Sequence, residues 1–224
     1  IAGWMFASQR MGETMPGYAF AGLLYLLVVS LLLLQPDVGQ AAVVTAIFGV
    51  QFFLAGLPMI LVIVMVLGGI GMLVSAYFVF PHVQSRIDRF LDPAAGDTFQ
   101  IDKAREAFMN GGLFGRGPGE GIAKANLPDS HADFVFAVAG EELGLIACLI
   151  IVGIFAFIVL RGFSRVLQDN DLFVVVAATG LLVQFGLQAL INMASTLSLI
   201  PTKGMTLPFL SYGGSSLLAL GIGM

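Results

Sequence analysis

Charged residues are scarce in this 224-residue chain, where lysine, arginine, aspartate and glutamate together make up 11% of the sequence. Soluble globular domains carry about 25% charged residues, so this composition excludes an ordinary soluble globular domain. The single cysteine, Cys148, excludes an intrachain disulfide and a cysteine-based metal site. Because the net charge is −4 and no basic tail occurs, nucleic acid is not an expected partner.

Apolar residues dominate instead, at 58% of the chain, and they form long continuous runs. A helix needs roughly 20 such residues to cross a bilayer. Membrane β-strands alternate apolar and polar residues, which these runs do not do. The sequence therefore predicts an all-α polytopic membrane protein with about six transmembrane helices. The expected spans are 18–34, 41–57, 59–80, 134–160, 172–193 and a sixth that begins near Leu207.

The spans form one membrane domain, 1–224, which one long polar loop interrupts at 81–132. Apolar residues recur at helical spacing in 82–92 and 98–109, which predicts two amphipathic helices at the membrane surface. The chain begins at Ile1, and its last apolar run reaches Met224. We interpret the sequence as a fragment of a longer protein.

The segment 111–121 holds six glycines in eleven residues. No strand precedes it and no Gly-Lys-Ser/Thr follows it, so a nucleotide-binding loop is not supported. A cluster of turns is the simpler interpretation, with Arg116 facing an anionic headgroup.

Charge counting leaves the membrane orientation open. The loop 81–132 carries six of the ten lysines and arginines, which by a plain positive-inside count would make it cytoplasmic. That rule weakens for long loops, and the same loop also carries seven acids.

Asp133 lies where the polar segment Leu127-Pro-Asp-Ser-His-Ala-Asp-Phe134 runs into an apolar helix. A carboxylate at the edge of a membrane span is costly unless it is paired or used. Ser130 and Asp133 have the spacing of a capping box, which is one interpretation. The other is a general base at the membrane surface, oriented by His131 or Asp129. Both stay open on the residues alone.

Two further acids, Glu141 and Glu142, follow in the motif Gly-Glu-Glu-Leu. Successive helical residues are rotated by about 100°, so the two side chains cannot both line one cavity with Asp133. We expect Glu141 to line a substrate cavity and Glu142 to anchor a neighbouring helix. A structural hydrogen bond to another helix is the alternative for Glu141.

Polar residues recur at helical spacing in the fifth apolar run, at Gln184, Gln188, Asn192 and Ser195. They form a polar stripe on an apolar helix. Interhelical hydrogen bonding is one interpretation of this stripe. The other is the wall of a polar cavity, in which Gln188 and Asn192 contact substrate.

The densest motif is Pro-Thr-Lys-Gly-Met-Thr-Leu-Pro-Phe-Leu-Ser-Tyr-Gly-Gly-Ser-Ser at 201–216. Lys203 is expected on the same membrane side as Asp133, where an ammonium meets phosphate as a point charge. Ser211 and Tyr212 precede two glycines that allow close approach of the backbone to a ligand. Snorkelling of Lys203 and close helix packing are the structural alternatives.

Gln35 and Asp37 end the first span on the side expected for Lys203. We count both as candidate substrate contacts. A polar stop followed by a turn is the structural alternative.

Three motifs taken together resemble one known family. Their order and spacing are similar to those of the SEDS family of bacterial cell-wall polymerases, which includes FtsW, RodA and SpoVE, and the Pro-Thr-Lys-Gly form resembles FtsW most. The resemblance covers essentially the whole chain and implies spans five to ten of a ten-span fold. The motifs are Gln35-Pro-Asp-Val-Gly39, then Leu127-Pro-Asp-Ser-His-Ala-Asp-Phe-Val-Phe136 with Gly140-Glu-Glu-Leu-Gly144, and then Pro201-Thr-Lys-Gly204 with Ser211-Tyr-Gly-Gly-Ser-Ser216.

The resemblance implies a peptidoglycan glycosyltransferase that polymerises lipid II outside the bacterial cytoplasmic membrane, at the division septum. It implies that the loop 81–132 is extracytoplasmic, against the plain charge count. The family's essential loop carboxylate falls on Asp133, and its important loop lysine falls on Lys203. The implied partners are a class B penicillin-binding protein, which is a transpeptidase, and other divisome proteins. A divalent cation, Mg²⁺ or Mn²⁺, stays open as a cofactor.

The resulting hypothesis makes Asp133 the catalytic base toward a lipid II hydroxyl. Lys203 and Arg116 would then meet the undecaprenyl pyrophosphate that leaves. Two other functions stay open. A lipid II flippase would use Glu141 and the polar stripe as a transport path, and a scaffold would only recruit the transpeptidase.

Overall fold

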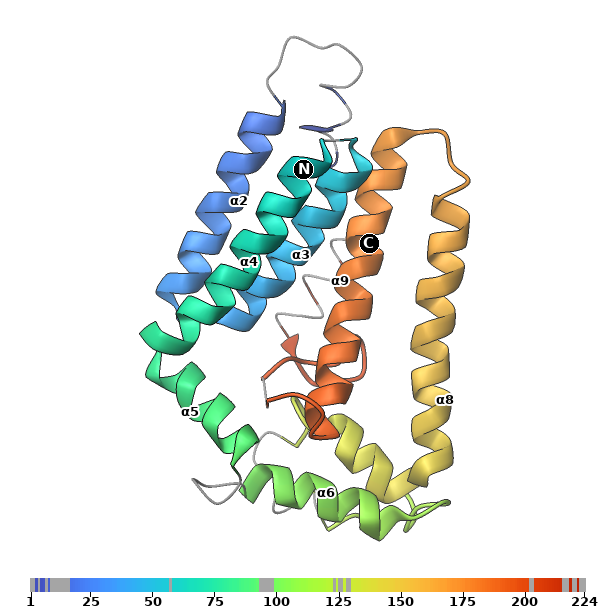
Figure 1. Cartoon of the computed structure of the whole chain (residues 1–224). Coiled ribbons are helices and arrows are strands. Elements are labelled where there is room, and N and C mark those ends of the chain that lie inside the picture. Colours follow the sequence, from blue (N-terminus) through green and yellow to red (C-terminus); the bar gives the residue numbers. More distant parts are fainter. Residues whose placement is uncertain are drawn as a thin grey trace. The chain divides into compact units, whose positions relative to one another are not determined.

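The computed structural model is all-helical in the secondary structure that it describes (Figure 1). Its helices follow the apolar runs of the sequence, as the predicted fold class requires. The described residues are 17–56, 58–92, 99–122, 130–201 and 204–214, with the single residues 3, 5, 6, 8, 124, 127, 218 and 221.

Three apolar helices form the N-terminal part, α2 (Gly17–Leu34), α3 (Val38–Leu54) and α4 (Met59–Val79). All three were predicted, but α3 begins three residues earlier than expected. The reason is Asp37, whose carboxylate accepts a hydrogen bond from the Gln40 amide at 3.1 Å and so caps the helix.

The predicted surface helices are also present, as α5 (Pro81–Leu91) and α6 (Phe99–Gly111). Two long helices follow, α8 (Val135–Val166) and α9 (Leu172–Thr196). Among the described residues, α2, α4, α8 and α9 are long and apolar enough to cross a membrane, whereas α3 is a shorter apolar helix of 17 residues. The chain is a multi-pass membrane protein by this architecture.

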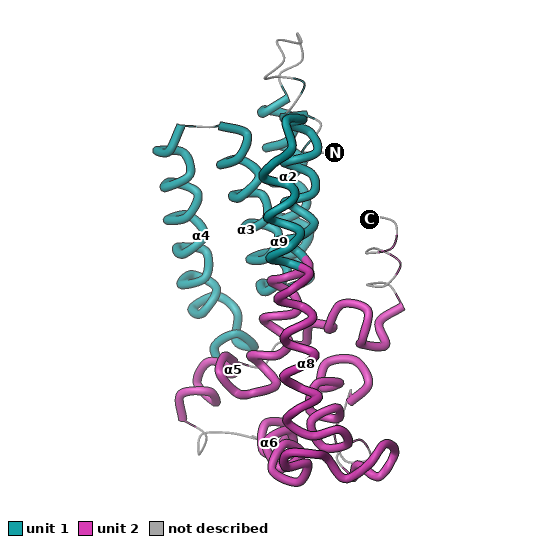
Figure 2. Tube along the Cα trace, turned by 90° about the vertical axis from the view of Figure 1, so that its right-hand side faces the viewer, with its two compact units in different colours: residues 1–84, 159–184 teal, residues 85–158, 185–224 magenta. Residues whose placement is uncertain are grey.

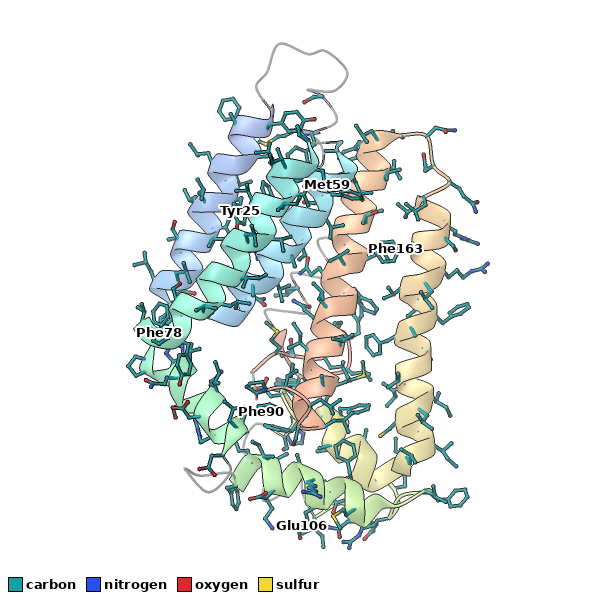
Figure 3. The ribbon with its side chains drawn as sticks, viewed as in Figure 1. Tyr25, Met59, Phe78, Phe90, Glu106 and Phe163 are labelled. Carbon is teal, nitrogen blue, oxygen red and sulfur yellow. The ribbon has the colours of Figure 1, made fainter. Side chains whose placement is uncertain are left out.

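The outer faces of the long helices are apolar and uncovered. In the most apolar stretch of α4 only 6% of the residues are buried within the protein. Phe78 points outward from α4, with 77% of its surface exposed (Figure 3). Such faces are stable against lipid and not against water. The exposure therefore agrees with a membrane environment.

The predicted sixth span does not begin at Leu207. Residues 208–210 form a turn in which Phe209 has a φ of 61°, a left-handed value that a right-handed helix cannot contain. The Leu207 amide donates instead to the Ser211 hydroxyl at 2.7 Å. Gly214 is the first helical residue described beyond this turn.

The chain divides into two compact units, each formed from segments that are distant in sequence (Figure 2). Unit 1 comprises 1–84 and 159–184, and unit 2 comprises 85–158 and 185–224.

Aromatic rings form the core of unit 1. The Phe6 side chain is fully buried and meets the Phe52 ring edge-on, with the ring centroids 4.8 Å apart. Tyr25 stacks on Phe48 at 4.5 Å, and its hydroxyl lies 3.0 Å from Thr45 Oγ1. Aromatic pairs add about 0.5–1.5 kcal/mol each beyond the area they bury. These rings therefore hold α2 and α3 together.

A core cluster of unit 2 combines alanines with larger apolar side chains where α6 lies close to the start of α8. Ala104 and Ala107 on α6 pack with Phe134 and Ala137. The small side chains allow close approach of the two backbones. This packing supports the turn that holds Asp133.

Candidate functional site

Asp133 lies in a turn immediately before α8, which begins at Val135. The predicted capping box at Ser130 is wrong, because residues 130–133 are not helical and the Ser130 hydroxyl donates to the Lys124 carbonyl at 3.2 Å. Asp133 is half-buried. Its carboxylate is therefore presented from a turn and not from the first turn of a helix.

The Asp133 carboxylate lies against the backbone of Gly204. A Cβ atom added to Gly204 would lie 2.9 Å from Asp133 Oδ2 and 3.9 Å from Oδ1. Gly204 is the residue after Lys203 in the Pro-Thr-Lys-Gly motif. The fold thus brings the acid of one motif to the loop of the other, although 71 positions separate Asp133 from Gly204.

The side chain of Asn192 connects the same two segments, the turn that contains Asp133 and the loop that contains Gly204. Its side-chain amide donates to the Asp133 carbonyl at 2.9 Å and to the Met205 carbonyl at 2.5 Å. The side chain is fully buried in α9. Asn192 therefore makes structural hydrogen bonds, but its partners belong to a turn and a loop and not to another helix, as interhelical bonding would require.

Ser211 and Tyr212 complete the loop. The Tyr212 amide donates to the His131 carbonyl at 2.9 Å, which ties the loop to the turn before Asp133. Ser211 is buried and accepts the hydrogen bond of Leu207, whereas Tyr212 is 84% exposed. His131 is exposed as well. The predicted residues His131, Asp133, Asn192, Ser211 and Tyr212 thus come together in one place, which we call the Asp133 site.

The polar stripe of α9 is buried in the part that belongs to unit 2. Gln188 is 8% exposed, and Ser195 is 5% exposed. Ser195 and Thr196 both donate to the Asn192 carbonyl of their own helix, at 2.9 and 2.7 Å. A substrate contact by Gln188 stays a prediction.

Glu141 and Arg116 form a separate polar site. The Glu141 side chain is fully buried, and its Oε1 lies 3.9 Å from an Arg116 guanidinium nitrogen. Both line a cavity of about 150 Å³, together with Lys103, Glu106 and Asn110 of α6. Asp133 is not among its lining residues. Glu141 therefore lines a cavity that does not include Asp133, and a substrate contact by Glu141 stays a prediction.

Glu142 anchors the glycine-rich segment and not a neighbouring span. One carboxylate oxygen lies 3.0 Å from the Lys124 ammonium, and the other accepts a hydrogen bond from the Gly119 amide at 2.9 Å. No local pattern of residues predicted this pairing, because Lys124 and Gly119 lie 18 and 23 positions away from Glu142.

A break in α8 explains the many glycines of 111–121. Gly144 has a φ of 80°, so the helical hydrogen bonds that cross it are lost. The glycine-rich segment supplies replacements. The Arg116 and Gly117 amides donate to the Glu141 and Glu142 carbonyls, both at 3.0 Å.

The same segment also satisfies the amides beyond the break. Leu145 donates to the Gly112 carbonyl at 2.9 Å, and Ile146 donates to the Leu113 carbonyl at 3.3 Å. Backbone must approach backbone for this, and a Cβ on Gly115 would lie 2.2 Å from the Glu142 carbonyl oxygen. The glycine segment is thus a structural insert that completes a broken helix.

The remaining predicted residues lie elsewhere. Lys203 and Asp129 are outside the described residues. Gln35 and Asp37 belong to unit 1, so their relation to the Asp133 site stays a prediction. Among the residues that the structure describes, no cluster of three His, Cys, Asp or Glu side chains could hold a metal ion.

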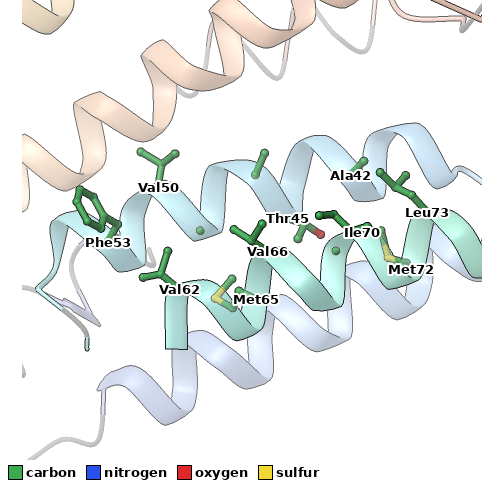
Figure 4. Close-up of a pocket in the computed structure, with 13 residues that line it drawn as sticks. Ala42, Thr45, Val50, Phe53, Val62, Met65, Val66, Ile70, Met72 and Leu73 are labelled. Atoms are coloured by element: carbon green, nitrogen blue, oxygen red, sulfur yellow. The ribbon is translucent and has the colours of Figure 1, made fainter. Parts of the chain in front are cut away.

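Unit 1 contains a cavity of another character. A space of about 460 Å³ lies between α3 and α4 and is lined by apolar side chains such as Val50, Phe53 and Met65 (Figure 4). Thr45 also lines it, but its hydroxyl already bonds to the Ala41 carbonyl at 2.7 Å. This lining offers no acid, base or nucleophile for chemistry.

The fold and the Asp133 site define a multi-pass helical membrane protein with a polar site where a span meets its loop. The chain belongs to the FtsW/RodA/SpoVE family of cell cycle proteins, whose family model matches residues 4–224.

Curated relatives agree with this assignment. The chain is 53% identical over 224 residues to a Caulobacter vibrioides (strain NA1000 / CB15N) protein named probable peptidoglycan glycosyltransferase FtsW, with 99% of this chain covered. A protein of the same name from Trichlorobacter lovleyi is 41% identical over 202 residues and covers 86% of the chain. The alignments cover 57% and 52% of these two relatives, so the chain spans about half of their length.

Solved structures show the same fold. A chain of a peptidoglycan synthase complex, described as coordinating polymerization and crosslinking, aligns with a TM-score of 0.71 at 30% identity over 97% of this chain and 64% of its own length. The Thermus thermophilus rod shape determining protein RodA aligns with a TM-score of 0.60 at 31% identity, over 92% of this chain and 54% of its own.

Proposed function

We propose that this chain belongs to a peptidoglycan glycosyltransferase that polymerises lipid II into glycan strands during cell division. The observation that carries the proposal is the position of the Asp133 carboxylate against Gly204, in the motif that also contains Lys203. A base and a cation on one loop cluster suit a transfer from a pyrophosphate-linked sugar. The names of the curated relatives support the same activity.

The proposed step is an inverting displacement. Asp133 accepts the proton of the 4-hydroxyl of the acceptor lipid II GlcNAc, as that oxygen forms a bond to C1 of the donor chain's MurNAc. The bond from C1 to the pyrophosphate oxygen breaks, and its electron pair leaves with undecaprenyl pyrophosphate. A positioned general base contributes roughly 10²- to 10⁴-fold to such a step.

Cationic side chains would meet the charge of the leaving group. Lys203 is the first candidate, because it precedes Gly204 in the chain. Arg116 is the second, although its guanidinium also faces Glu141 at 3.9 Å. The exposed side chains of His131 and Tyr212 are candidates for sugar contacts.

A divalent cation, Mg²⁺ or Mn²⁺, would neutralise pyrophosphate if it took part. The described part of the Asp133 site offers one carboxylate and one exposed imidazole, which is not a complete ligand set for such an ion. No step of the proposed displacement uses a metal.

The proposed setting is the bacterial cytoplasmic membrane at the division septum, with the Asp133 site on the extracytoplasmic face. The proposed partner is a class B penicillin-binding protein, within a larger set of divisome proteins. The match to a chain from a complex that joins polymerization to crosslinking supports such a partner.

The test is polymerisation of purified lipid II by the full-length protein with its transpeptidase partner. Asp133→Asn should lower the rate of glycan formation roughly 10²- to 10⁴-fold, because the amide cannot accept the proton. The matched control is Asp169→Asn in unit 1, since among the described residues the Asp169 carboxylate accepts a turn hydrogen bond from the Asp171 amide at 2.9 Å. An amide oxygen accepts the same bond, so this variant should polymerise normally.

Polymer formation by Asp133→Asn at the wild-type rate would refute the proposed base. Lipid II transport by the wild-type protein without formation of glycan polymer would favour the flippase. Complex formation with unchanged growth in both Asp133→Asn and Lys203→Ala would favour the scaffold.

A further inference from the structure

The Asp133 carboxylate depends on two neighbours that the proposed reaction does not use. The first is Gly204, whose missing side chain leaves the space that Asp133 Oδ2 occupies. Gly204 is exposed, and its φ lies outside the left-handed region. The backbone conformation therefore does not require glycine here, but a larger residue would displace the Asp133 carboxylate from its present position.

The second neighbour is Asn192, which donates to the backbone carbonyls of both Asp133 and Met205. Two carbonyl acceptors require an N–H donor, so the orientation of the amide group follows from its partners. A single fully buried side chain thus ties the turn of Asp133 to the loop of Gly204.

A backbone bond on the other side of the loop completes the arrangement. The Tyr212 amide donates to the His131 carbonyl at 2.9 Å, two residues before Asp133. The turn and the loop are therefore held at two points, with the Asp133 carboxylate and Gly204 in contact. A displacement of the loop would displace the carboxylate as well.

We propose that Asn192 and Gly204 are positioning residues, which set the place of the Asp133 carboxylate relative to the acceptor hydroxyl. The inference rests on the proposed function, because it gives Asp133 the role of base. A general base must lie within hydrogen-bond reach of its proton, and a misplacement of about 1 Å can lower a rate roughly 10²-fold. Asn192 acts through the backbone, and Gly204 acts by leaving space.

Gly204→Ala is the sharper of two variants. Its Cβ would lie 2.9 Å from Asp133 Oδ2, so the carboxylate must rotate, while the exposed backbone can stay in place. We expect kcat for lipid II polymerisation to fall roughly 10- to 100-fold, with little change in KM and in the unfolding temperature. The matched control is Gly153→Ala in α8, where no atom lies within 4 Å of the added Cβ and activity should be unchanged.

Asn192→Leu removes both donors at similar volume and should also lower kcat roughly 10-fold or more. Its control is Thr196→Val, since the equally buried Thr196 hydroxyl donates only to the Asn192 carbonyl of the same helix. If Asn192→Leu fails to fold, Gly204→Ala still tests the positioning role, because Gly204 lies at an exposed position and not in the core.

A double-mutant cycle separates positioning from a purely structural role. If Gly204 acts through Asp133, adding Gly204→Ala to Asp133→Asn should cause less than a twofold further loss of kcat. The full loss of the single variant in that background would overturn the inference. So would a wild-type kcat for Gly204→Ala beside an impaired Asp133→Asn, which leaves the proposed function standing. Unimpaired Asp133→Asn would instead refute Asp133 as the base of the proposed function, and the inference with it.

Discussion

Two acidic positions of unit 2, the Glu141–Glu142 pair and Asp133, lie only eight or nine residues apart in sequence, yet their surroundings differ. Glu141 is fully buried beside Arg116, and Glu142 binds Lys124 and a backbone amide. Asp133 is half-buried and lies against a glycine. Glu141 is enclosed by its own chain, and Glu142 is held by two partners, so both carboxylates serve the structure. The half-buried Asp133 carboxylate lies beside the exposed Gly204, where a substrate can reach it. We therefore expect Glu141 and Glu142 to determine stability and Asp133 to determine activity.

Gly144→Ala should have the largest effect on stability. The substitution forces a side chain into a left-handed conformation, and the Cβ would lie 2.4 Å from the Gly115 amide nitrogen. The two effects together should lower the free energy of unfolding by roughly 3 kcal/mol or more. Thermal unfolding in detergent measures this, with Gly153→Ala as the control. An unchanged unfolding temperature would contradict the glycine insert as the support of the broken helix.

Glu141→Ala should have the second-largest effect on stability. It leaves a space in the core and removes the carboxylate that faces Arg116. Removal of one partner of a buried pair costs about 3–5 kcal/mol, but the Arg116 side chain is 37% exposed, so we expect about 2 kcal/mol. The control is Glu120→Ala, at an exposed position of the glycine-rich segment that contains Arg116, and it should leave the unfolding temperature unchanged. Equal unfolding temperatures for the two variants would mean that burial of Glu141 does not stabilise unit 2.

Glu142→Gln should have a smaller effect. The amide oxygen can still accept the hydrogen bond of Gly119, while the charge that attracts Lys124 is lost. A partly exposed ion pair contributes about 0.2–1 kcal/mol, and salt screens it. The loss should therefore shrink when the unfolding temperature is measured again in 1 M salt. A loss that is independent of salt would assign the stability to packing.

Asp133→Asn should have the smallest effect on stability although it impairs polymerisation most. The substitution is isosteric, and the Asn192 bond is made to the Asp133 backbone, which the variant retains. Because the half-buried side chain keeps its shape, we expect the free energy of unfolding to change by no more than about 0.5 kcal/mol. An unfolding temperature lowered as far as in Glu141→Ala would break the comparison, because Asp133 would then serve structure as well.

The sequence was sufficient to predict most helices. Apolar runs of span length and the two amphipathic segments correspond to α2, α3, α4, α5, α6, α8 and α9. The errors are local. The start of the sixth span was wrong because the left-handed Phe209 interrupts an otherwise apolar segment, and the break at Gly144 was missed because one glycine in an apolar run gives no sign of a positive φ.

The candidate site was predicted in part. The motifs identified His131, Asp133, Asn192, Ser211 and Tyr212, which the fold brings together. The contact between Gly204 and Asp133 was not predicted. The position of Gly204 after Lys203 in the Pro-Thr-Lys-Gly motif was the one feature of the sequence that could have drawn attention to it. The stripe of α9 was visible, but the atoms that bind Asn192 were not, since they are backbone carbonyls far away in sequence.

The sequence by itself determined the membrane class, most of the helices and the residues whose side chains could act in catalysis or binding. Composition and periodicity are local properties of the chain, which is why they suffice for this. Only the tertiary structure decided which acid meets which partner. Asp133 meets Gly204, and Glu141 meets Arg116, through a turn, a broken helix and a glycine insert. Contacts of this kind depend on where distant backbone segments pack, and no local pattern of residues encodes that.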